Sequence, residues 1–220
     1  VDRRQRQMCI RDRTGNQIYV DGVPLAAGQG ATTTSRGSLQ SLLQIRDEYA
    51  PSMQDHLDEI ARVLVVSFAE QDQTASALPD LPGLFTWAGG TIPAGATIVP
   101  GMSSTITVNP ALIQSLGGNP QLLRDGGING AAYNSNPSGA SGYSALLDSY
   151  VQKLDEPVAF DVAAGLSTTT SLMGFAADSI GWLELNRSDA ETSAESREAS
   201  RFRSAEALSN ITGVSLDEEM

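Results

Sequence analysis

One apolar stripe constrains the fold of this chain more than any other feature. Between residues 53 and 68, apolar residues recur at intervals of three and four, the spacing of one face of an α-helix. The stripe consists of Met53, Leu57, Ile60, Ala61, Leu64 and Phe68. We expect the remaining charged positions to form a solvated face: Asp55, Asp58, Glu59, Arg62 and Glu70. The pattern predicts an amphipathic helix of about five turns, whose apolar face needs a partner.

A second, longer helical pattern covers residues 169–210. Its stripe begins strongly with Leu172, Phe175, Trp182 and Leu183, thins to Ala and Ser residues, and recovers at 202–208. Small residues allow close approach of helices but bury little area per turn, so such a helix is marginal alone. We expect it to lie antiparallel against the first helix, or against neighbouring subunits.

Shorter patterns fill the rest of the chain. Residues 17–20 predict a strand followed by a turn at 21–22, and residues 28–35 are a polar link. A helical pattern begins at Leu39, and Pro51 is expected to interrupt it. Residues 144–154 predict another helix, with Tyr150 on its apolar side.

Residues 77–110 are rich in Pro and Gly and predict a small β-rich unit. The expected strands are residues 84–87, 97–99 and 104–108. After them, Asn109 is expected to cap a short helix over 110–116, and a Gly-, Asn- and Ser-rich loop covers 125–142. We therefore predict an α+β fold, mainly α: an elongated antiparallel helical rod with a small β-rich insertion.

These patterns predict six consecutive segments. The first and last are a non-native stretch at 1–13 and the start of a terminal assembly helix at 213–220. Between them we expect a strand, turn and linker at 14–36, one part of the helical rod at 37–76, the β-rich unit with its loops at 77–142, and the second part of the rod at 143–212.

The charge balance excludes some classes of partner. The formal net charge is −12, and because residues 1–13 contribute +3, the remaining residues sum to −15. Lys153 is the only lysine. Such a body repels nucleic acid and anionic membranes, so we expect neither as a partner. No apolar stretch approaches the ~20 residues of a membrane span, and no signal peptide is visible.

The two ends of the sequence are unusual. Residues 1–13 have the composition of a basic arm for nucleic acid or targeting, but the run also resembles translated sequencing-adapter read-through. We favour the second interpretation and expect the segment to pack against nothing. At the other end, Ser215 and Glu218 form a capping-box pattern two residues after Gly213. We expect 213–220 to be weakly ordered here and critical for assembly in a longer protein.

Candidate sites are few. His56 and Glu59 have the spacing of half a metal site on a helix, but we expect His56 to lie on the charged, solvated face. The loop 126–130 resembles a phosphate-binding loop only superficially, and a turn is the better interpretation. The acidic pairs, such as Asp47–Glu48, could in principle form the carboxylate pair of a glycosidase, but we expect them to be ordinary surface residues. The triplets beginning at Asn186 and Asn210 match the N-glycosylation pattern, and we expect them to be ordinary surface residues as well. The single cysteine, Cys9, excludes a disulfide framework and a Cys-based metal site. We expect no catalytic residue, no cofactor and no metal.

The order of several motifs resembles the bacterial flagellar hook-associated protein 1 family. The resemblance covers about residues 17–220, and it is carried by residues 37–43, 46–47, 51, 57–61, 82–85, 123–133 and 213–220. The last segment is similar to the Gly-Val-x-x-Asp-Glu-Glu segment that opens the terminal helix of flagellar rod, hook and junction proteins. The family's N-terminal helices and the helix after 220 are absent, so the chain resembles a middle-to-C-terminal piece.

The resemblance implies a structural role without enzyme activity: a ring of subunits that joins hook to filament and so supports motility. Its implied partners are further copies of itself, the hook protein, the second hook–filament junction protein and a flagellar export chaperone. It also implies an extracellular location, reached by flagellar type III export without a cleaved signal peptide. The competing hypothesis is a secreted adhesin-like module that binds through the β-rich unit, and an enzyme that uses His56 comes third. A β-rich unit that folds as a separate sandwich would favour the adhesin.

Overall fold

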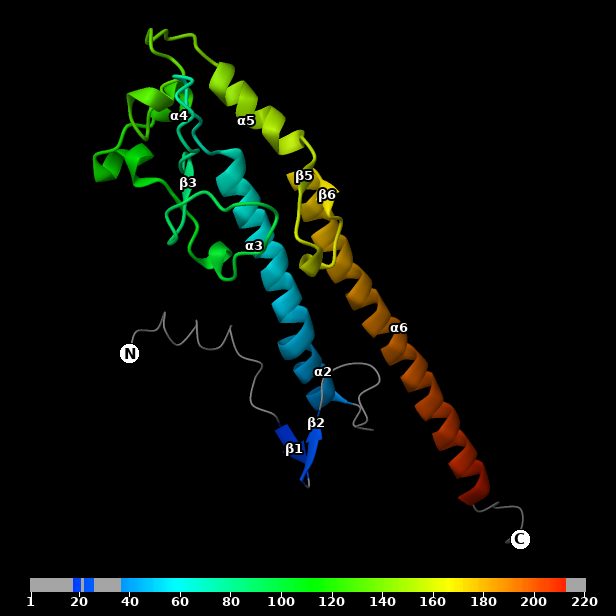
Figure 1. Ribbon diagram of the computed structural model, residues 1–220. Coiled ribbons are helices and arrows are strands. Elements are labelled where there is room, and N and C mark those ends of the chain that lie inside the picture. Colours follow the sequence, from blue (N-terminus) through cyan, green and yellow to red (C-terminus); the bar gives the residue numbers. More distant parts are fainter. Residues whose placement is uncertain (1–17, 21, 26–36, 213–220) are drawn as a thin grey trace, which may run out of the picture. The chain divides into compact units, whose positions relative to one another are not determined.

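The computed structural model describes residues 18–20, 22–25 and 37–212 (Figure 1). The chain divides into two compact units, Val1–Ala176 and Ala177–Met220. Within the described residues, helices predominate and strands occur only as three antiparallel pairs. The expected α+β, mainly α class is therefore confirmed. The predictions for 1–13, for the polar link at 28–35 and for 213–220 concern segments outside the described residues.

Gly22, the described residue of the turn expected at 21–22, lies between two short strands. β1 (Ile18–Val20) pairs antiparallel with β2 (Val23–Leu25), and Ile18 lies opposite Leu25. Gly22 in the connection has a φ of 78°, a conformation that glycine adopts without a steric penalty. The turn signal in the sequence is therefore correct.

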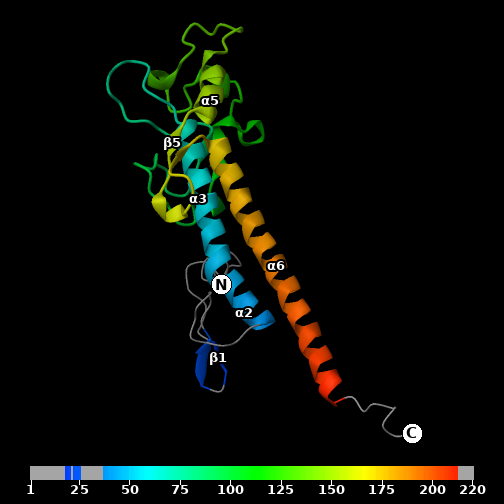
Figure 2. The same ribbon diagram turned by 90° about the vertical axis from the view of Figure 1, so that its right-hand side faces the viewer.

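A continuous helical stretch follows, and Pro51 does not interrupt it as predicted. It runs from α2 (Ser38–Gln44) through a π-helical turn (Ile45–Tyr49) into α3 (Ala50–Ser67), as Figure 2 shows. Pro51 lies in the first turn of α3, directly after the π-helical turn. A proline clashes with the carbonyl one α-helical turn earlier, and a wider turn relieves that clash. The Ser52 hydroxyl also donates to the Glu48 carbonyl at 2.9 Å.

Helix α3 contributes to two apolar clusters. In Figure 1 the green segments that follow it lie on one side and the yellow segment around β5 and β6 on the other. One cluster contains the buried side chains of Val63, Phe160, Ala164, Leu172 and Phe175. The other contains Ala61, Val65 and Met102, with Phe85, Trp87, Ile92, Val99 and Ile106 packed against them. Because the chain covers α3 on more than one side, the helix has no broad solvated face.

The segment expected to be β-rich contains little strand. β3 (Phe85–Thr86) pairs with β4 (Thr107–Val108), whereas the strand predicted over 97–99 is absent. The short helix expected over 110–116 is replaced by two 3-10 turns, Pro110–Leu112 and Gln114–Leu116. Asn109 caps the first turn as predicted, because its Oδ1 accepts a hydrogen bond from the Ala111 N–H at 3.1 Å. The following loop includes α4 (Leu122–Asp125) and a 3-10 turn at Ala131–Tyr133.

The chain then returns along α5 (Ala145–Asp155), close to the predicted bounds. β5 (Val158–Ala159) pairs antiparallel with β6 (Thr169–Thr170), and a 3-10 turn at Val162–Ala164 lies between them. Phe160, directly after β5, stacks on Phe175 with ring centroids 4.0 Å apart. This segment supplies much of the apolar surface that covers α3.

The long helix α6 (Leu172–Thr212) has 41 residues. Its first residues belong to the first unit, where Leu172 and Phe175 pack with Val63 of α3. The expected contact between the two helices is confirmed for these residues. It is wrong for Leu57, which is 47% exposed, and Phe68 packs against Phe85 and Tyr150 instead.

Candidate functional site

The polar face of α3 carries the most elaborate arrangement of functional groups in the first unit. The sequence predicts a solvated face, and the structure corrects that prediction. His56, Asp58, Glu59 and Arg62 are buried, and so is Glu70, which follows the helix. Asp55 alone of the expected face remains partly exposed. Polar side chains are buried at low cost only when they are hydrogen-bonded, so their partners define what this face does.

His56 lies in the apolar cluster, not on a charged surface. Its side chain is 1% exposed, and its ring meets that of Phe175 edge to face, with centroids 6.2 Å apart. Nε2 lies 3.0 Å from the Ala164 carbonyl oxygen, so this nitrogen carries the proton and donates it. Burial lowers the pKa of His56 below its ordinary value, against smaller raising effects of the Ala164 bond and of Asp55. The histidine is therefore neutral near pH 7 and fastens the 162–164 turn to α3.

Glu59 and His56 do not form the half metal site that their spacing allows. Both carboxylate oxygens of Glu59 face Arg62, at 2.7 Å from Nε and 2.9 Å from Nη2. Glu59 Oε2 also accepts the Asp161 N–H at 2.9 Å. Within the described part of the chain, no group of three or more His, Cys, Asp or Glu side chains is placed to hold a metal ion.

Arg62 extends this arrangement to two distant loops. Its Nη1 donates to the Gly95 carbonyl at 2.9 Å, and its Nη2 donates to the Ala159 carbonyl at 2.8 Å. One buried ion pair therefore binds main-chain groups from both segments that cover α3. Asp161 continues the connection, since its Oδ2 accepts the Ile98 N–H at 2.9 Å.

Asp58 and Glu70 hold two further loops. Asp58 accepts the main-chain N–H groups of Gly101 and Ser103 at 2.7 and 2.8 Å. Glu70 accepts those of Ile128 and Asn129 at 2.9 and 2.8 Å. The second pair belongs to the Gly-rich loop 126–130, whose N–H groups thus already bind a carboxylate of the same chain. The interpretation of that loop as a turn is supported by the bridge between Gly126 and Asn134 that closes it.

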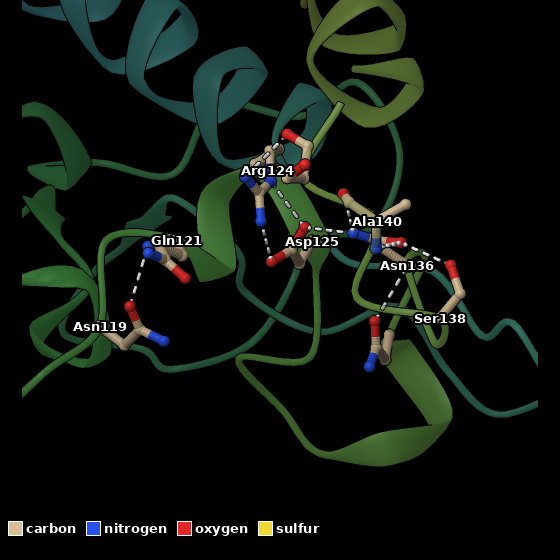
Figure 3. Close-up of polar contacts among 9 residues, drawn as sticks. Asn119, Gln121, Arg124, Asp125, Asn136, Ser138 and Ala140 are labelled. Carbon is tan, nitrogen blue, oxygen red and sulfur yellow. Dashed lines mark hydrogen bonds and ion pairs between the residues drawn. The ribbon is translucent and has the colours of Figure 1, made fainter. Parts of the chain in front are cut away.

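Asp125, directly before this loop, fixes its start (Figure 3). Arg124 donates to both carboxylate oxygens of Asp125 at 2.7 Å, and Asn136 Nδ2 donates to Oδ1 at 2.7 Å. These bonds, that from Arg124 first, lower the pKa of Asp125 to about 2. Asn136 in turn accepts the Ala140 N–H at 3.0 Å and the Ser138 hydroxyl at 3.2 Å. These hydrogen bonds occupy the Asp125 carboxylate, which therefore stabilises the loop.

The remaining predicted positions are structural as well. Asp47 is paired with Arg46 at 2.6 Å on the surface, as expected for an ordinary acidic pair. Asn186 lies within α6, where its Nδ2 donates to the Trp182 carbonyl one turn earlier at 2.8 Å. Asn210 is exposed on the same helix.

Helix α6 presents a surface of a different kind. Over 177–211 most of its residues are exposed, including several large apolar side chains. Those side chains are Ile180, Leu183, Leu185, Phe202, Leu208 and Ile211. Exposed apolar residues repeated along a helix are typical of a surface that binds another helix.

The sequence patterns alone did not reveal the role of the acidic residues of α3. Helical periodicity distinguishes apolar from polar positions, but it does not reveal whether irregular loops cover the polar side. One signal was available: Gly- and Pro-rich segments with little strand must satisfy their N–H groups somewhere. A helix with several carboxylates beside such segments is a suitable source of acceptors.

Comparison with known proteins adds no assignment. No protein-family model, no curated protein and no solved structure matches the chain. Among the helices that the structure describes, none is both long and apolar enough to cross a bilayer.

Proposed function

We propose that this chain is a structural subunit of the bacterial flagellum, which joins the hook to the filament through packing of helices between subunits. In this role it forms a ring with copies of itself and contacts the hook protein and the second junction protein. It reaches the cell exterior by flagellar type III export, with an export chaperone as a transient partner. The motif order over 37–61, 82–85 and 123–133 supports the family, and the proposal assigns no enzyme activity.

The observation that carries the proposal is the surface of α6. The 177–211 part of this 41-residue helix exposes Ile180, Phe202 and Ile211. In proteins, most of the stability of a helix comes from packing of its apolar side chains, so these residues favour a helical partner. Tubular assemblies supply such partners through contacts repeated from subunit to subunit.

The polar face of α3 supports a structural role over the adhesin-like alternative. The segment 77–142 contains only two strands of two residues each, and Asp58, Arg62 and Glu70 fasten its loops to α3 or its end. A unit held in this way is part of the helical body. It lacks the two packed sheets that a separate sandwich domain requires.

The test is localisation combined with gene disruption in the source bacterium. Antibodies raised against the purified chain are applied to isolated flagella with gold detection, and the gene is disrupted and then restored. We expect gold at the hook–filament boundary, and disrupted cells with hooks but no filaments, non-motile until the gene is restored. Filaments that persist in the disrupted strain overturn the proposal. Gold confined to the cell surface, with lost attachment and normal motility, supports the adhesin instead.

A further inference from the structure

A single stripe runs along the exposed part of α6. Starting at residue 180, positions separated alternately by three and four residues return to one side of the helix through residue 211. We call these positions the α6 stripe: Ile180, Leu183, Arg187, Ala190, Ala194, Arg197, Arg201, Ser204, Leu208 and Ile211. All of them are exposed, and Ile180 and Ile211 at its ends are 63% and 82% exposed. The stripe differs from the face of Ser179, Trp182 and Asn186, which is more buried.

The spacing of the α6 stripe positions is the same in both directions along the helix. Two copies placed antiparallel bring Ile180 opposite Ile211, and in the same register Leu183 lies opposite Leu208. Ala190 then faces Arg201, and at the centre Ala194 faces Arg197. Every stripe position meets another stripe position, because the alternation of three and four is preserved on reversal. This is the property that an interface with two-fold symmetry requires.

Charge along α6 favours the same orientation. Residues 178–195 contain five acidic side chains and one arginine, whereas residues 196–211 contain three arginines and two glutamates. An antiparallel pair sets the acidic half of each copy against the basic half of the other, and a parallel pair sets like halves together. Arg201, whose ion pair with Glu198 of its own helix is long at 3.6 Å, then comes beside Glu191 of the other copy. Because Glu191 and Glu184 already bind Arg187 of their own helix, at 2.6 and 2.9 Å, the charge preference comes from the two halves of α6 as a whole and not from one new ion pair.

We propose that α6 is a self-association surface, on which a second copy of this chain binds antiparallel with Ile180 opposite Ile211. The overlap covers residues 180–211, about 48 Å of helix. The large apolar residues lie towards the two ends of the overlap, while the alanines at 190 and 194 allow close approach near its centre. Arginines in the stripe limit the buried apolar area, so the dimer is weak and dissociates more readily as salt is added. The inference concerns the free chain and does not depend on the flagellar assignment.

The first test measures association by sedimentation velocity from roughly 1 µM to 1 mM, the range of weak complexes. Ala194→Arg sets two arginines against each other at the centre of the pair. The matched control is Ala199→Arg, which introduces the same side chain at an exposed position on the opposite side of α6. We expect the unaltered chain to form a dimer. Ala194→Arg should raise the dissociation constant of this dimer about tenfold or more, and Ala199→Arg should leave it unchanged. Circular dichroism confirms that both variants keep their helix content.

The second test determines the register by disulfide formation in a Cys9→Ser background. One chain carries Ile180→Cys and another carries Ile211→Cys. We expect cross-linked dimers only when the two are mixed, because each position faces the other. A monomer at every concentration overturns the inference, and so does equal weakening by both arginine variants. Cross-linking of Ile180→Cys chains to one another shows a parallel pair and overturns the register. None of these outcomes bears on gold labelling of the hook–filament boundary.

Discussion

Glu59 and Arg62 form a bidentate ion pair one turn apart on α3, with both side chains almost fully buried. Removing one member of such a pair leaves an uncompensated charge in the interior. Arg62 also holds the Gly95 and Ala159 carbonyls, so the pair connects the two loop segments that cover the helix. Breaking the ion pair should therefore loosen the attachment of both segments to α3.

We expect Arg62→Met to lower the free energy of unfolding by about 3–5 kcal/mol, measured by urea denaturation. The control is Arg187→Met, which breaks exposed ion pairs with Glu184 and Glu191 and is expected to cost no more than about 1 kcal/mol. The double variant Glu59→Leu/Arg62→Met should cost less than the sum of the single changes. Equal effects of the two methionine variants would contradict a buried pair.

His56→Ala should destabilise the protein more than Leu57→Ala does, although leucine is the more hydrophobic residue. Loss of His56 removes a buried ring and its bond to Ala164, at about 2–4 kcal/mol. Loss of Leu57, which is 47% exposed, should cost about 1 kcal/mol. Thermal or urea denaturation of the two variants side by side checks the order. A larger loss of stability in Leu57→Ala than in His56→Ala would contradict the burial of His56 and support the solvated position that the sequence predicts.

The stability of the protein should depend on pH through His56. Because burial lowers the pKa of this histidine in the folded state, the unfolded chain binds more protons as the pH falls below about 6.5. Stability is therefore lost on acidification through this range. The slope of unfolding free energy between about pH 7 and pH 5 should be smaller in His56→Ala than in the unaltered chain. Asp55, whose pKa is raised chiefly by burial, opposes this trend and is present in both proteins. Identical slopes would show that His56 does not titrate differently on unfolding.

Glu70→Gln tests the attachment of the Gly-rich loop. The amide NH2 replaces one of the two carboxylate oxygens that accept bonds from Ile128 and Asn129, so one of these bonds is lost and we expect a loss of about 1–3 kcal/mol. Amide exchange at 128 and 129 should also become faster. Glu156→Gln, at an exposed position after α5, is the control and should change neither quantity. Unchanged exchange at 128 and 129 in Glu70→Gln would contradict the attachment.

Two glycines should respond oppositely to alanine. A Cβ at Gly83 would meet the main-chain carbonyl of Phe68, which cannot move aside without shifting the end of α3. A Cβ at Gly181 has nothing within 4 Å. Gly83→Ala should therefore destabilise the protein, whereas Gly181→Ala should stabilise α6 by about 0.5–1 kcal/mol. Thermal denaturation followed by circular dichroism measures both.

Sequence periodicity predicted the longer helices α5 and α6 well and the environment of α3 poorly. The bounds of α5 and α6 follow from stripes of Leu, Phe and Ala, because burial of one face is a local property of the sequence. The surroundings of Asp58 and Glu70 depend on loops more than 40 residues away, such as Gly101. The spacing of charged residues carries no information about which distant N–H groups they accept.

Pro51 shows a second limit. The sequence correctly identifies a residue that an α-helix does not readily accept, but it does not reveal that the preceding turn can widen. The π-helical turn at Ile45–Tyr49 accommodates the proline and lets the helix continue. A change of helix type over one turn is thus enough for the helical stretch to accept a proline.

The side chains of α3, and Glu70 just after it, hold the loops mainly by main-chain atoms: the N–H groups of Gly101, Ile128 and Asp161, and the carbonyls of Gly95 and Ala159. Such atoms are present whatever side chain a loop residue carries. Substitutions in the loops can therefore accumulate without detaching them, as long as the backbone path is kept. Substitutions at a few positions of α3 release whole segments at once, so a survey of random variants should find tolerance concentrated in the loops and intolerance on one helix.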